Sequence, residues 1–142
     1  AGPEALIRAM ITVQSQSTTN PCSVSQAAAV AALTGDQTCI AEMVKAYRAR
    51  HDYVVPALNA IPGFECRPGE GTFYAFPRVQ QAIEACGLED DVEFTEFLLN
   101  EADVAVVPGT AFGAPGYIRL SFACAMEDLE ESVQRINRAV PA

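Results

Sequence analysis

The sequence predicts an α+β fold in two layers, and three observations predict it. A long run of apolar residues at helical spacing ends at residue 61. The period then changes to two in the short segments FECR and TFYAF, as in strands. Further helix and strand patterns follow to the end of the chain. We therefore expect a small sheet of three or four strands with three helices after residue 62, preceded by a helical segment.

Two helices separated by a polar loop are predicted in residues 1–36. The proline of AGPEALI occupies a first helical position and opens a short helix that ends at Ala9 or Met10. The segment ITVQSQSTTNP is predicted as a loop because Pro21 disfavours helical backbone at the preceding residue. A capping box in SVSQ starts the Ala-rich helix SVSQAAAVAALT, which Gly35 can end.

A long amphipathic helix is expected over residues 37–61, connecting the first segment to the rest of the chain. Pro56 lacks a backbone N–H and its ring crowds the preceding turn, so we expect a kink there. The apolar stripe of this helix consists of Ile40, Met43, Val44, Tyr47, Val54, Val55 and Leu58.

The α+β unit is expected over residues 62–142. FECR and TFYAF flank the turn PGEG and predict a hairpin. The later elements are expected to be helices at 79–86 and 91–100, strands at 104–107 and 117–122, and a final helix at 126–139. The core stripe of that last helix is Leu129, Val133, Ile136 and Val140.

Composition argues against several classes of partner. The net charge of −9 has the wrong sign for a protein that binds nucleic acid or an anionic membrane. No apolar run is long enough to cross a bilayer. Five widely spaced cysteines and one histidine predict neither a disulfide framework nor a metal site, a pattern typical of reduced thiols in a cytoplasmic protein.

The strand YIRLSF carries the most informative polar residue. Strict alternation places Arg119 on the face opposite Ile118 and Leu120, which belong to the core face. An arginine in the middle of a short apolar strand is costly to bury unless its donors meet a carboxylate or phosphate. An arginine on a solvated sheet face is the alternative, and the strand pattern alone leaves it open.

Other residues that could carry chemistry have weaker contexts. Lys45 has Glu42 three residues before it on a helix, and lacks the desolvation or neighbouring cation that a Schiff-base lysine needs. His51 has no serine or cysteine at a spacing that indicates a nucleophile pair. The loop QSQSTTN could bind a phosphate or could simply be solvated.

Three segments, taken in order, resemble one family. They are QSQSTTNPCSVSQAAAVAAL, RARHDYVVPALNAIPGFECRPGEGTFYAFP and ADVAVVPGTAFGAPGYIRLSFACAMEDLEESVQRI. Over essentially the whole chain they resemble the C-terminal part of class I pyridoxal-phosphate-dependent aminotransferases of the aspartate aminotransferase type, which have fold type I. The resemblance implies that residues 1–36 end the large domain, that residues 37–61 form a connecting helix, and that residues 62–142 form the small domain.

The resemblance also implies roles for individual residues. Arg119 matches the family's arginine that binds the substrate's α-carboxylate in a bidentate ion pair. Tyr74 and Phe73 would lie toward the substrate pocket. A loop that approaches the cofactor phosphate of the neighbouring subunit in a homodimer is matched by Thr18, Thr19 and Asn20. The implied substrates are an amino acid and a 2-oxo acid, in a cytoplasmic enzyme of amino acid metabolism.

The chain departs from the family at the cofactor lysine. That lysine sits in an S-K-x-x-x-x-x-G-x-R motif, which Lys45, the one lysine here, does not match. We therefore expect the chain to be the last third of the enzyme, to bind no pyridoxal phosphate alone and to be inactive alone. Two alternatives stay open: another pyridoxal-phosphate reaction on the same fold, by a lyase or a synthase, and a non-enzymatic module that binds a carboxylate or a partner protein.

Overall fold

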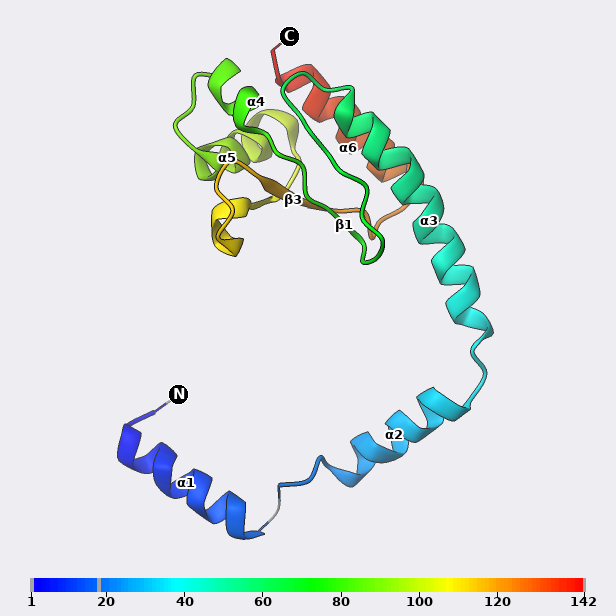
Figure 1. Ribbon diagram of the computed structural model, residues 1–142, viewed down its shortest axis with the longest axis vertical. Helices are drawn as coiled ribbons and strands as arrows, with labels where there is room; N and C mark the ends of the chain where they lie inside the picture. The colour runs from blue at the N-terminus through cyan, green and yellow to red at the C-terminus, as the bar shows by residue number, and fades with distance from the viewer. Residues whose placement is uncertain (1, 18, 142) are drawn as a thin grey trace. The chain divides into compact units, whose positions relative to one another are not determined.

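The fold combines six α-helices with a three-stranded sheet in the part of the chain that is described, which confirms the α+β prediction (Figure 1). The structure is a computed structural model and describes residues 2–17 and 19–141. The chain divides into two compact units, residues 1–39 and residues 40–142. Within the described residues, no helix is both long enough and apolar enough to cross a membrane.

The first helix, α1 (Glu4–Ser17), is longer than predicted. Residues 11–17, expected in the loop, are helical because they contain no glycine or proline and because their polar side chains bond within the helix. The Thr12 hydroxyl donates to the Arg8 carbonyl at 3.0 Å, and the Ser15 hydroxyl donates to the Thr12 carbonyl at 2.8 Å. The polar composition of this segment was therefore a misleading loop signal.

The second helix, α2 (Ser23–Thr34), has the predicted extent but a different start. Ser23 is its first helical residue, so the predicted capping box is wrong. Cys22 is the N-cap and makes no side-chain capping bond, while the Gln26 amide donates to the Pro21 carbonyl at 2.8 Å. Gly35 ends the helix with extended backbone. Neither α1 nor α2 has a buried residue among those described.

The long helix α3 (Thr38–Asn59) starts at a side-chain cap and continues through Pro56. The Asp36 carboxylate accepts bonds from the Thr38 backbone N–H at 2.9 Å and from its hydroxyl at 2.7 Å. Of the predicted apolar stripe, only Val54 and Leu58 are buried. The earlier members of the stripe are exposed, namely Ile40, Met43 and Val44.

The sheet has the order β1-β3-β2 and is antiparallel throughout. β3 (Ile118–Ser121) is its central strand, between β1 (Tyr74–Ala75) and β2 (Val107–Pro108). Ala75 pairs with Leu120, and Val107 pairs with Arg119.

Two strand predictions need correction. FECR does not form a hairpin strand with TFYAF: its pairing is the single bridge between Glu65 and Arg78, and β1 pairs with β3 instead. The strand predicted at 104–107 begins only at Val107, because Asp103 and Val104 complete the C-terminal cap of the preceding helix, α5 (Asp91–Ala102). Asp103 caps that helix in left-handed backbone with φ of 53°, and the Val104 N–H bonds back to the Leu98 carbonyl at 3.1 Å.

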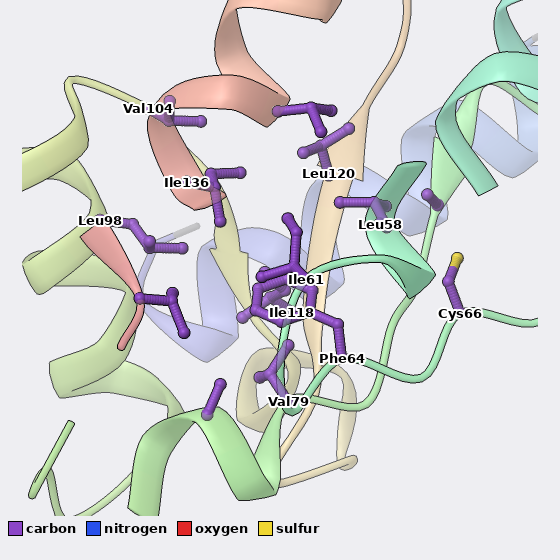
Figure 2. Close-up of a cluster of buried hydrophobic side chains, with 14 of the residues drawn as sticks. Leu58, Ile61, Phe64, Cys66, Val79, Leu98, Val104, Ile118, Leu120 and Ile136 are labelled. Atoms are coloured by element: carbon purple, nitrogen blue, oxygen red, sulfur yellow. The ribbon is translucent and has the colours of Figure 1, made fainter. Parts of the chain in front are cut away.

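The three later helices lie close to their predicted positions. They are α4 (Gln80–Ala85), α5 (Asp91–Ala102) and α6 (Met126–Ala139), and a short 3₁₀ helix, η1 (Gly109–Phe112), follows β2. The predicted stripe of α6 is fully buried, as are Ile118 and Leu120 of β3. Side chains from α3, α5, β3 and α6 meet in one core, shown in Figure 2 by Leu58, Leu98, Ile118, Leu120 and Ile136. This core covers one face of β3 and leaves its other face accessible.

Candidate functional site

Arg119 lies on the accessible face of β3, in the middle of the strand. The buried neighbours Ile118 and Leu120 fix the strand on the core, so the alternation of side chains directs Arg119 to the opposite face. Its guanidinium carbon lies 4.4 Å from the ring centre of Tyr74 and 4.6 Å from that of Phe112. The cation therefore makes cation–π contacts with an aromatic ring from β1 and with another from η1.

A second pair of rings supports this arrangement. Phe76 stacks on Tyr117, with ring centres 5.3 Å apart and an angle of 12° between the planes. The ring of Phe112 meets Phe76 edge-on, with centres 6.1 Å apart. Aromatic pairs at such distances add to the stability of a cluster. Phe112, which is 48% exposed, is therefore held between Phe76 and the guanidinium of Arg119.

The side chain of Arg119 makes no ion pair with a carboxylate within residues 2–17 and 19–141. Three other arginines do so: Arg8, Arg78 and Arg135. The contacts with the two rings are made without hydrogen bonds, so they do not use the N–H groups of the Arg119 guanidinium. A planar fork of N–H donors matches the two oxygens of a carboxylate. The arrangement is thus suited to binding a small carboxylate.

The structure separates the two aromatic residues expected at the substrate pocket. Tyr74 stacks on Arg119, whereas Phe73 faces α3, where its ring centre lies 6.0 Å from that of Tyr47. With His51 and neighbouring residues, Phe73 and Tyr47 line a hollow of about 330 Å³ between α3 and the loop before β1. Phe73 still touches Tyr74, with ring centres 4.5 Å apart.

The residues expected near a cofactor phosphate belong to the connection between α1 and α2. Thr19 and Asn20 are exposed there. Thr18 lies outside the described residues.

Lys45, the one lysine of the chain, is exposed on α3. A lysine that forms a Schiff base is normally desolvated or placed beside another cation. As placed here, therefore, Lys45 lacks the desolvation of a lysine that holds pyridoxal phosphate.

Two residues of the site were missed by the sequence analysis. Phe112 was not singled out, although it lies in PGTAFG, the loop that leads into the strand of Arg119. Asp91 was counted only as a helix start, yet it is 1% exposed and accepts hydrogen bonds from Thr110 and Gly116. Burial raises the pKa of Asp91, but these bonds lower it by more, so its pKa lies below the ordinary value.

Known proteins resemble this chain over nearly its whole length. Residues 1–136 match the family described as Aminotransferase class I and II. The chain is 49% identical over 141 residues to an aspartate/prephenate aminotransferase of Nitrosomonas europaea, covering 95% of this chain and 36% of that protein.

Solved structures of aminotransferases also match this chain over nearly its whole length. The crystal structure of the aspartate aminotransferase from Rhizobium meliloti matches with a TM-score of 0.78 and 42% identity, covering 98% of this chain and 36% of that one. The aspartate aminotransferase from Thermus thermophilus with maleate matches with a TM-score of 0.74 and 38% identity, covering 99% and 36%.

The matched region includes all three segments that carry the resemblance, with the strand of Arg119 among them. The chain spans 36% of the length of each of these relatives. It belongs to the class I and II aminotransferase family.

Proposed function

We propose that this chain is the C-terminal part of a pyridoxal-phosphate-dependent aminotransferase, which transfers an amino group between an L-amino acid and a 2-oxo acid. The observation that carries the proposal is the guanidinium of Arg119, which lies over the rings of Tyr74 and Phe112 and makes no ion pair with a carboxylate within the described part of the chain. Every amino acid and every 2-oxo acid presents a carboxylate, so one such arginine serves both halves of the reaction.

Arg119 binds and orients the substrate in this proposal. Two parallel N–H···O bonds to the α-carboxylate define the plane of that group, and contact with the two rings restricts the movement of the guanidinium. Orientation of this kind lowers the entropic part of the activation barrier. Tyr74 forms one wall of the substrate pocket, and Phe73 extends it behind Tyr74.

The rest of the site comes from outside this chain. Pyridoxal phosphate, when bound to a lysine, supplies an electron sink for the substrate's α-carbon. In the proposed enzyme, a cytoplasmic homodimer, Thr18, Thr19 and Asn20 approach the cofactor phosphate of the neighbouring subunit. This chain alone binds no cofactor and is inactive, because its one lysine, Lys45, is exposed on α3.

Substitution of Arg119 in the full-length protein, loaded with pyridoxal phosphate, tests the proposal. With aspartate and 2-oxoglutarate as substrates, we expect Arg119→Ala to raise KM for aspartate about 100-fold, because it removes a charged partner of a carboxylate. Cofactor content, read from absorbance, remains unchanged. Arg138→Ala on the exposed end of α6 is the matched control and leaves KM unchanged.

Two outcomes would contradict the proposal. Unchanged KM for aspartate and unchanged maleate binding in Arg119→Ala would show that Arg119 does not bind the substrate's carboxylate. Reproducible transamination by this 142-residue chain with added pyridoxal phosphate would show that the chain does not depend on a lysine from elsewhere.

A further inference from the structure

We propose that Asp91 is a positioning residue for substrate binding, which acts on Arg119 through the loop formed by residues 109–116. The inference rests on the proposed function, because it concerns how firmly the carboxylate-binding arginine is held. Asp91 is 1% exposed, and the roles described above for Arg119, Tyr74 and Phe73 do not involve it.

Asp91 ties both ends of the loop to the start of α5. One carboxylate oxygen accepts a bond from the Thr110 backbone N–H at 2.7 Å. The other oxygen accepts from the Thr110 hydroxyl at 2.8 Å and from the Gly116 N–H at 3.2 Å. An ionised carboxylate suits this place because it only accepts hydrogen bonds, and all three partners are donors. Its position in the first turn of α5 also favours negative charge.

The loop in turn positions Phe112 against Arg119. Phe112 lies between the two anchored residues, Thr110 and Gly116, and its ring lies 4.6 Å from the guanidinium carbon of Arg119. The loop is further closed by a bond from the Gly109 N–H to the Tyr117 carbonyl at 2.8 Å, next to β3. Phe112 is 48% exposed, so the anchored loop contributes to holding its ring in place in addition to the ring's contacts with Phe76 and Arg119. Loss of the Asp91 anchor therefore frees one of the two rings that contact the guanidinium of Arg119.

The test uses the full-length protein with bound pyridoxal phosphate and maleate as the probe. Asp91→Asn replaces one of the two acceptor oxygens by an NH₂ group, which is a donor. We expect it to raise the dissociation constant of maleate and KM for aspartate about tenfold. Cofactor content and kcat remain unchanged, because no group that touches the reacting atoms is altered. Asp90→Asn is the matched control: it removes the same charge one residue earlier, and Asn caps a helix as well as Asp.

Thr110 gives a second, milder pair of variants in case Asp91→Asn does not fold. Thr110→Val removes only the hydroxyl bond to Asp91 and is expected to raise the maleate dissociation constant about threefold, whereas Thr110→Ser keeps the bond and restores affinity.

The outcomes distinguish this inference from the proposed function. If Arg119→Ala loses maleate while Asp91→Asn, or Thr110→Val in its place, binds it like the wild type, the role of Asp91 is overturned and the proposed function stands. In Asp91→Asn, a fall in kcat or in cofactor content as large as the loss of maleate affinity would also overturn the role of Asp91, since such a fall indicates general damage to the fold. If Arg119→Ala binds maleate normally, the role of Asp91 and the carboxylate-binding role of Arg119 in the proposed function both fail.

Discussion

Arg119 shows how much the meaning of one residue depends on its neighbours in space. The cation–π contacts of its guanidinium with Tyr74 and Phe112 contribute about 1 kcal/mol for each ring. One ring comes from β1, which is distant from β3 in the chain, and the other comes from η1, a few residues before β3. From the strand pattern alone, a solvated arginine was the favoured interpretation. The surrounding rings and the family together favour carboxylate binding.

Asp91 gives the stability of the fold a pH dependence. Its pKa is below the ordinary value in the folded state, so the stabilisation is complete above about pH 4 and is lost as the pH falls through the folded-state pKa. We expect Asp91→Asn to lower the free energy of unfolding by about 2 kcal/mol at pH 7. Urea unfolding between pH 7 and about pH 2.5 measures the difference from the wild type, which should shrink below about pH 4. A difference that stays constant down to the lowest pH would contradict this role of the ionised carboxylate.

At the scale of the element, the loop of residues 109–116 is the most constrained connection near the site. Gly113 has φ of 72°, which glycine adopts without strain. Gly109 is required for another reason, because the backbone folds closely around it. A Cβ atom there would overlap the Ala114 carbonyl oxygen and lie 2.7 Å from that of Tyr117.

Gly109→Ala is therefore expected to lower the free energy of unfolding by about 3 kcal/mol, since backbone atoms must move to admit the methyl group. Gly71→Ala is the matched control: no atom lies within 4 Å of its Cβ position, and we expect a change within about 0.5 kcal/mol. Chemical denaturation of both variants is the measurement. Equal free energies of unfolding for Gly109→Ala and Gly71→Ala would contradict this prediction, because they would show that the loop relaxes to admit the methyl group.

The helices were predicted better than the strands, for a physical reason. α6 was expected at residues 126–139 and observed as Met126–Ala139, because its bonds and its apolar stripe are local. The strands β1 and β2 have two residues each and exist only through pairing with β3. Such pairing depends on which segments meet in space, and local periodicity does not specify it.

At the scale of the whole molecule, the core lies entirely in the second unit. It begins at Val54 and ends at Val140, and no described residue of α1 or α2 is buried. The free energy of folding must therefore come from the second unit, because burial of apolar surface is its largest favourable contribution.

Removal of residues 1–35 should leave the stability of the remainder unchanged within about 0.5 kcal/mol. Residues 36–142 keep the Asp36 cap of α3 and the complete core. Urea unfolding of this shortened chain and of the 142-residue chain, followed by the same signal, makes the comparison. A large fall in the unfolding midpoint would show that α1 and α2 contribute to the core unit after all.

The sequence by itself determined the fold class, the order and type of the helices, the two faces of β3 and the family. Each of these depends on local periodicity or on a contiguous motif. Only the tertiary structure decided which strands pair, which rings enclose Arg119, and that Asp91 reaches residues 19 and 25 positions further along the chain. Except for Phe112, which is a few residues before Arg119, the partners in these contacts are farther apart in the chain. They become neighbours only when the apolar residues between them pack into one core.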